Sequence, residues 1–540
     1  MRIKQILPYL LQPFLIAFFP IMRIYTFNIG EIPILHLFFA FITILAITSL
    51  VFFTTSLIYK NFTKGSFFTS LFFISFYSLD LAIRHILKPI IKKTNIQILD
   101  IFRVKHLLII SLLILIFVAI KIYKTNNIKL FRTKTLFIFL TTLYSITIIQ
   151  VIIEYRTIAY KHNQTIIRYN KQNEQFQKKL SQCARNIKKR IATKNMPDIY
   201  FIVLDAYPTN KHLLEYFNYD NSDFTNKLRK LKFNVLQNSL SNYNVTLYSL
   251  PSILNMNYLP DNIEYITQIH MWENNNVEFF LKELGYKTIS YKHHHQFPSQ
   301  SHKKISFVGY LKKELNEFFF GNFNLVHRFF QWNAILSQAV FIAKIKTTSE
   351  KTLRFNIKQK LSILKQLPLE AGPKFIYMHL VCPHTPHIFT ENGDIFSSSN
   401  SSLTGKEQFV QSVKFINKEI PQIIQTILAK STNPPIIMIQ GDHSGWASIC
   451  SSTIAELDID FKKANSMIQK NPSFPFEILF ACHFPNKQQE DVNPNLTSVN
   501  GFRFIFNHYF NINLELLKDK FFFFNHKENI IPEIKIETNK

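Results

Sequence analysis

The stretch Ile199-Tyr200-Phe201-Ile202-Val203-Leu204-Asp205 decides the fold of the second part of this chain. Six apolar residues follow one another without interruption, and the run ends in a carboxylate. An uninterrupted apolar run of this length is typical of a parallel strand that is buried on both faces. It therefore predicts an interior strand over residues 199–204, with Asp205 at the carboxyl end of that strand.

Similar runs recur further along the chain. Phe375–Leu380 leads into Cys382-Pro383-His384, and Pro435–Ile439 ends at Gly441-Asp442-His443. Gly285 is placed as a helix C-cap and is followed by a further expected strand over residues 286–291. Helical patterns lie between these strands, at residues 224–231, 277–284 and 407–429. This alternation predicts an α/β domain with a mainly parallel central sheet over residues 196–540.

Polar side chains follow three of the expected strands. In open α/β sheets, sites form beyond the carboxyl ends of the strands, so Asp205, His384 and the pair Asp442-His443 should meet at one edge. Each also has a plainer interpretation, as a helix cap, a turn residue or a loop hydrogen-bond acceptor. Two carboxylates and imidazole nitrogen are ligands that suit Zn²⁺, with Mn²⁺ or Ca²⁺ as alternatives.

The stretch Asn242–Ser252 starts polar and turn-like and then becomes apolar. Such a pattern predicts a loop that feeds a helix, with Thr246 near the junction. Thr246 would then be either an ordinary helix cap or a hydroxyl nucleophile at the positive end of a helix. A neighbouring metal would lower the pKa of that hydroxyl and neutralise charge on the oxygens of an ester substrate.

The first part of the chain is apolar. Five segments, at residues 6–22, 32–59, 67–86, 107–122 and 136–153, predict five transmembrane helices within residues 1–155. Residues 156–195 are polar and basic, which predicts a juxtamembrane helix and linker that either contacts anionic lipid or is solvated. The net charge of +27 is dispersed and flanks apolar spans, and no nucleic-acid-binding motif is present. We therefore expect membrane lipid, and no nucleic acid, as a partner.

The basic loops give conflicting signals about topology. Lys60 and Lys64, and the basic residues between 124 and 134, favour cytoplasmic loops, whereas the basic loop at 88–105 favours the opposite side. Asp80 and Arg84, within the predicted span at 67–86, are four residues apart and could pair on one helix face or meet a lipid headgroup. In the basic loop, residues 95–104 could form an interfacial helix.

Four motifs together resemble the alkaline phosphatase superfamily, and more narrowly its sulfatase-like membrane branch. They are Asp205 after its strand, Thr246-Leu-Tyr-Ser-Leu-Pro, Pro383-His384-Thr-Pro386 and Gly441-Asp442-His443. That branch includes phosphoethanolamine transferases and lipoteichoic acid synthases, in which five membrane helices carry an extracytoplasmic domain. The resemblance implies a multi-pass protein of the cell (inner) membrane that acts on lipids or glycans of the envelope.

The resemblance also implies roles for residues. Thr246 stands four residues before Leu250-Pro251, as the nucleophilic Thr of phosphoethanolamine transferases does. Asp442 and His443 match metal ligands, Asp205 takes the place of an acidic ligand that is often Glu, and Thr246 completes the set. His384 resembles a histidine near the substrate or near a second metal.

The chain also departs from the family pattern. The usual Gly after Asp-His is Ser444, and no cysteine flanks the Thr246 motif. Ser249-Leu-Pro251-Ser252 matches most of the C/S-x-P-S-R motif of sulfatases, but Ile253 replaces the Arg. A sulfatase is therefore one alternative, and a non-catalytic scaffold for envelope glycan assembly is another.

Several other residues have two interpretations. Arg503 is a candidate contact for an anionic headgroup or part of a structural salt bridge, and His293–His295 could bind metal or form a polar loop. His483 is expected to be structural. The four cysteines form no CxxC pair, so two disulfides or free thiols are both open.

Overall fold

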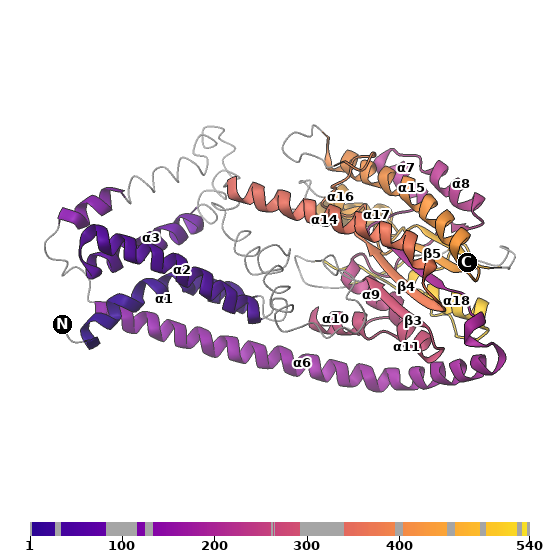
Figure 1. Cartoon of the computed structure of the whole chain (residues 1–540), viewed down its shortest axis with the longest axis horizontal. Coiled ribbons are helices and arrows are strands. Elements are labelled where there is room, and N and C mark those ends of the chain that lie inside the picture. Colours follow the sequence, from indigo (N-terminus) through magenta and orange to yellow (C-terminus); the bar gives the residue numbers. More distant parts are fainter. Residues whose placement is uncertain are drawn as a thin grey trace. The chain divides into compact units, whose positions relative to one another are not determined.

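A computed structural model of the chain describes residues 3–27, 34–82, 116–124, 133–260, 263, 265–291, 340–394, 403–450, 459–485, 493–525 and 532–536 (Figure 1). The chain divides into two compact units. The first unit comprises residues 1–161 and 304–349, and the second comprises residues 162–303 and 350–540.

The described residues of the first unit are largely helical. This unit contains α1 (Ile3–Phe27), α2 (Ile34–Tyr59), α3 (Phe62–Ala82) and the start of α6 (Thr133–Arg190). Two stretches, Tyr9–Thr26 and Leu35–Tyr59, are long and apolar enough to cross a membrane. A buried contact of 3.2 Å between the hydroxyls of Thr55 and Thr69 helps to join α2 to α3.

The described residues thus contain two candidate membrane spans, where five were predicted. Lys64 and Asp80 lower the hydropathy of α3, and the apolar stretch Leu140–Ile153 in α6 is shorter than a full span. Most of the predicted span at 107–122 lies outside the described residues, as do Arg84 of the predicted pair, the segment 95–104 and His293–His295.

The predicted linker is part of α6, which runs without interruption through the basic segment. Leu180, Ala184 and Ile187 lie on one face of this helix, at spacings of four and three residues, and are fully buried in a core of the second unit. The Tyr169 hydroxyl donates to Asn255 Oδ1 at 2.7 Å. The end of α6 is therefore an integral layer of the second unit, which begins at residue 162.

The second unit is built on a six-stranded sheet with the strand order β2-β6-β5-β1-β4-β3. The strands are β1 (Ile199–Leu204), β2 (Asn234–Leu236), β3 (Lys287–Tyr291), β4 (Lys374–Leu380), β5 (Ile436–Gly441) and β6 (Phe480–His483). The strands β3, β4, β1 and β5 run parallel, and their ends lie within two residues of the predicted strands. A separate two-stranded sheet pairs β7 (Phe521–Phe522) with β8 (Glu533–Ile534).

The prediction of a mainly parallel sheet was wrong, because the sheet is mixed. β6 is antiparallel to both β5 and β2. The chain leaves β5 and returns to the sheet at the same edge, where Leu479 N–H donates to Tyr207 O and Gly441 N–H donates to Leu479 O. Because the connection leaves and re-enters the sheet at the carboxyl end of β5, the next strand, β6, runs in the opposite direction.

Helices cover both faces of the sheet (Figure 1). Tyr200, Ile202 and Leu204 of β1 face one hydrophobic core, and Ile199, Phe201 and Val203 face the other, as the twofold period of a strand requires. The first core is covered by α7 (Asn210–Phe217), α8 (Ser222–Lys230), the end of α14 (Val340–Gln366), α15 (Gly405–Lys430), α16 (Trp446–Cys450) and α17 (Phe461–Lys470). The second is covered by the end of α6 with α9 (Thr246–Asn255), α10 (Tyr265–Glu273), α11 (Asn276–Glu283) and α18 (Gly501–Phe510). Short 3₁₀ turns lie at Thr193–Asn195, Leu367–Leu369 and Ser498–Asn500.

Candidate active site

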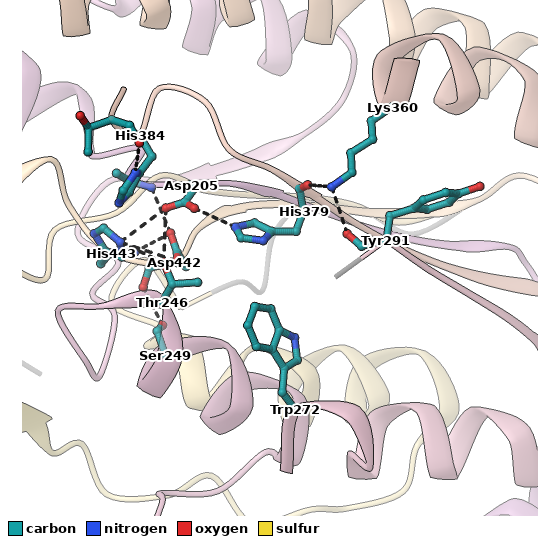
Figure 2. Close-up of polar contacts among 12 residues, drawn as sticks. Asp205, Thr246, Ser249, Trp272, Tyr291, Lys360, His379, His384, Asp442 and His443 are labelled. Carbon is teal, nitrogen blue, oxygen red and sulfur yellow. Dashed lines mark hydrogen bonds and ion pairs between the residues drawn. The ribbon is translucent and has the colours of Figure 1, made fainter. Parts of the chain in front are cut away.

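The carboxyl ends of β1, β4 and β5 bring the predicted polar residues together. Asp205 N–H donates to Leu380 O at 3.0 Å, and His384 N–H donates to Asp205 O at 3.1 Å, so the loops after β1 and β4 are tied to each other. Ligand atoms of Asp205, His384 and His443 all lie within 4.8 Å of one another. Figure 2 shows these side chains converging at the end of the sheet.

The close approach of two of these loops depends on Gly441 at the end of β5. A Cβ atom at this position would lie 2.1 Å from the backbone oxygen of Tyr207, in the loop after β1. Only glycine leaves room for that oxygen. The glycine therefore allows Asp442 to lie beside the loop that carries Asp205.

Thr246 begins α9, as the sequence predicted, with Val245 as an extended N-cap residue. The Thr246 hydroxyl oxygen lies 3.4 Å from Asp205 Oδ1 and 3.3 Å from His443 Nε2. Thr246 and His384 are partly exposed, whereas Asp205, Asp442 and His443 are buried. The hydroxyl thus lies at the amino end of a helix, where backbone dipoles favour an anion, on a residue that is partly exposed.

Ser249, one helical turn later, has a different environment. Its side chain is fully buried, and its hydroxyl donates to the backbone oxygen of Asp442 at 2.6 Å. This bond ties α9 to the end of β5. The two candidate nucleophiles therefore differ in their contacts. The Ser249 hydroxyl donates to a backbone oxygen, whereas the Thr246 hydroxyl contacts the side chains of Asp205 and His443.

In three candidate ligands, a side-chain atom is held by a hydrogen bond to the backbone. Asp442 Oδ1 accepts from the N–H of Ala206 at 3.0 Å and from its neighbour His443 at 3.1 Å. His443 Nδ1 donates to Ser444 O at 2.8 Å, and His384 Nδ1 donates to Thr385 O at 2.6 Å. Because a backbone oxygen holds Nδ1 in each ring, Nε2 is the nitrogen that is left to face the site.

Asp442 Oδ2 is buried and, among the described residues, accepts no hydrogen bond; His443 Nε2 lies 3.8 Å from it. A buried carboxylate oxygen without a hydrogen-bond partner is costly unless a cation lies against it. Carboxylate, imidazole and hydroxyl donors are also those that Zn²⁺ and similar divalent ions prefer. The residues present therefore fit a divalent metal ion.

His379 is a member of the cluster that the sequence analysis did not single out. It lies on β4, with its Nε2 atom 3.0 Å from Asp205 Oδ2, and it can form a second ligand group with Asp205 and Asp442. Its backbone oxygen accepts from the buried Lys360 Nζ at 2.8 Å. The available signal was an imidazole within a fully buried strand that is otherwise apolar after Lys374.

The electrostatics of the cluster follow from burial and mutual pairing. Burial alone raises the pKa of Asp205, but His384, His379 and His443 together bring that pKa well below its usual range. Burial lowers the pKa of His443, but Asp442 and Asp205 outweigh burial and raise it to about 9. Burial lowers the pKa of Lys360 to about 7 despite the attraction of Asp205. Asp205 is therefore ionised at neutral pH.

Two other predicted residues lie outside this cluster. Arg503, on α18, donates to the backbone oxygens of Met256 at 2.8 Å and Glu515 at 2.6 Å, and its guanidinium lies over the Phe176 ring. His483 ends β6, with its Nδ1 donating to Pro435 O at 3.3 Å. Both side chains make structural contacts here, and all four cysteines are free thiols.

No family model and no curated protein sequence matches the chain. Among solved structures, the chain is similar to the C-terminal periplasmic domain of EcEptC from Escherichia coli, with TM-score 0.37 and 12% identity over 62% of this chain and 92% of that one. It is also similar to the lipoteichoic acid synthase LtaP from Listeria monocytogenes, with TM-score 0.34 and 11% identity over 62% and 79% of the two chains.

A third similar structure is the integral membrane protein lipooligosaccharide phosphoethanolamine transferase A (EptA) from Neisseria meningitidis. Its TM-score is 0.31, with 10% identity over 74% of each chain.

Proposed function

We propose that this chain is a membrane-anchored, metal-dependent enzyme that transfers or hydrolyses a phospho-substituent of an envelope lipid or glycan, with Thr246 as the nucleophile. The observation that carries the proposal is the position of the Thr246 hydroxyl. It lies at the amino end of α9, 3.4 Å from Asp205 Oδ1 and 3.3 Å from His443 Nε2, next to the buried Asp442.

The metal would be held by Asp205, Thr246, Asp442 and His443, with Zn²⁺ favoured and Mn²⁺ or Ca²⁺ as alternatives. When bound, such an ion supplies Lewis-acid chemistry, which lowers the pKa of a bound hydroxyl and neutralises charge on phosphate oxygens. The amino end of α9 adds backbone dipoles that favour the anionic phosphate.

In the first half-reaction, Thr246 Oγ1, after losing its proton to solvent, forms a bond to phosphorus while the bond from phosphorus to the donor oxygen breaks. The leaving oxygen takes a proton from protonated His384, whose Nδ1–H is fixed on Thr385 O and whose ring is partly exposed. In the second half-reaction, a hydroxyl of a glycan, a lipid or water gives a proton to His384 and displaces Thr246 from phosphorus.

The surroundings of Ser249 favour this proposal over a sulfatase. The Ser249 hydroxyl donates to Asp442 O in a fully buried position, and Ile253 stands where the sulfatase motif has Arg. A non-catalytic scaffold would have no need for a buried carboxylate oxygen without a hydrogen bond, so measured metal content separates it from either enzyme.

Purified full-length protein in detergent tests the reaction. Labelled phosphatidylethanolamine and phosphatidylglycerol are offered as phosphodiester donors and an aryl sulfate as the competing ester, before and after chelation. We expect turnover of a phosphodiester, loss of turnover on chelation, and recovery with Zn²⁺. Turnover of the sulfate ester alone would favour the sulfatase.

The proposal includes a location. The apolar helices of the first unit would anchor the protein in the cell (inner) membrane as a multi-pass protein, with the second unit outside the cytoplasm, where envelope lipids and glycans are found. Fusion of an export-dependent reporter enzyme after about residue 160 should give an active reporter. A reporter that is active only in its cytoplasmic form would exclude this topology and an envelope substrate.

A further inference from the structure

The two carboxylate oxygens of Asp205 face different partners. Oδ1 lies 3.4 Å from the Thr246 hydroxyl and 3.5 Å from His443 Nε2. Oδ2 accepts from His379 Nε2 at 3.0 Å, and the two side chains of this pair are 3% and 2% exposed. Figure 2 shows His379 on the side of Asp205 away from His443. One oxygen therefore faces the nucleophile, and the other is held by an imidazole.

His379 is itself held firmly. It lies opposite Val203 in the paired strands β1 and β4, and Lys360 Nζ donates to its backbone oxygen at 2.8 Å. The ring of Trp272 lies 6.0 Å from the imidazole ring, measured between centroids. An imidazole fixed by a central strand, a buried cation and an indole can orient a neighbouring carboxylate.

The other candidate ligands are oriented by the backbone. Asp442 is held by two N–H groups, and His443 and His384 by backbone oxygens. The outer carboxylate oxygen of Asp205 is held instead by a side chain, that of His379. Its orientation therefore depends on a residue that substitution can remove.

We propose that His379 is a positioning residue that makes Asp205 a one-oxygen metal ligand by holding Oδ2. Together with Thr246, Asp442 and His443, a carboxylate that binds through one oxygen gives four donors, the number that zinc sites favour. Without His379, Oδ2 is released to bind the same ion or to admit water. This inference rests on the proposed function.

Cobalt(II) is the probe, because its visible absorption is strong in four-coordinate sites and weak when the coordination number rises. Full-length protein is stripped with a chelator and titrated with Co²⁺. For the wild type we expect strong absorption. For His379→Ala we expect weaker absorption and a Kd raised by roughly 10–100-fold, the usual cost of losing an outer hydrogen-bond partner.

Two variants serve as controls. His379→Gln keeps an N–H donor near the position of Nε2 and should retain the absorption, with a Kd within a few-fold of the wild type. His483→Ala removes another buried histidine, at the end of β6 on Pro435 O, and should leave both readouts unchanged. Thermal unfolding identifies any variant that does not fold; if His379→Ala fails, His379→Asn replaces it, since Asn is too short to reach Asp205 Oδ2.

Several results would overturn the inference. One is a folded His379→Ala protein with wild-type Kd and absorption. Another is a loss in His379→Gln as large as in His379→Ala, which would make His379 a ligand itself. A wild type that binds no Co²⁺ would refute the proposed metal-dependent function as well, whereas a wild type that binds Co²⁺ with no change in His379→Ala refutes this inference alone.

Discussion

The ends of β1 and β5 look alike in sequence and are built differently. Each is a buried apolar strand followed by an aspartate, and both aspartates are buried at the same edge of the sheet. Asp442 is held by backbone N–H groups of Ala206 and His443, whereas Asp205 is held by the His379 side chain. The fold alone orients Asp442, while Asp205 also needs one particular side chain from β4.

The largest expected effect comes from removing one of the proposed metal ligands. Asp442→Ala, His443→Ala and Asp205→Ala should each strip the metal, because each removes a proposed ligand. Metal content of the purified variants is the measurement. Undiminished metal in both Asp442→Ala and His443→Ala would show that the proposed ligand set is wrong.

The same variants sharpen the contrast between the two strand ends. Without metal, Asp442→Ala leaves two buried backbone N–H groups without their acceptor, whereas Asp205→Ala leaves one buried side-chain donor, His379 Nε2, so Asp442→Ala should lose more stability. The cost of such an unsatisfied group is about 1–3 kcal/mol. Chemical denaturation of the metal-free proteins measures the free energy of unfolding of each variant. Equal losses in Asp442→Ala and Asp205→Ala would contradict the proposed difference between the two strand ends.

A smaller effect is expected where the two strand ends touch. Gly441→Ala places a Cβ atom 2.1 Å from the Tyr207 backbone oxygen, so one loop must move. We expect a loss of about 1–3 kcal/mol in the free energy of unfolding, as for other overpacked sites, together with weaker metal binding. Gly501→Ala is the control, because its nearest atom is the edge of the Phe480 ring at 3.1 Å. Wild-type stability and metal affinity in Gly441→Ala would contradict this account of the contact.

The smallest effect concerns the link between α9 and β5. Ser249→Ala removes the hydroxyl that donates to Asp442 O, which should cost about 0.5–1.5 kcal/mol of stability and leave turnover measurable. Denaturation and steady-state turnover are the two measurements. Complete loss of turnover in a folded Ser249→Ala protein would indicate that Ser249 takes part in the chemistry.

Much of this edge of the sheet was predictable because strands buried on both faces give continuous apolar runs. Those runs located β1, β4 and β5, and so Asp205, His384, Asp442 and His443. The junction at Thr246 was also predictable, from the change between a polar turn and an apolar helix.

The remaining features depend on contacts between distant segments. β6 is only four residues long, and its direction is set by backbone bonds at Tyr207 and Gly441. His379 was missed because a strand pattern does not show which carboxylate lies across the neighbouring strand. Residues 156–195 were predicted as a juxtamembrane helix and linker, and their charged residues give no sign that Leu180, Ala184 and Ile187 form a face buried in the core of the second unit.

The most direct test of the central claim is the intact mass of the protein after incubation with a phosphodiester donor. The account predicts a phospho-substituted adduct that peptide fragmentation maps to Thr246. It also predicts that Thr246→Ala keeps the fold but has neither adduct nor turnover, because the partly exposed hydroxyl contributes little to stability. An adduct on Ser249, or an aldehyde formed from Ser249, would contradict the account and assign the protein to sulfatase chemistry.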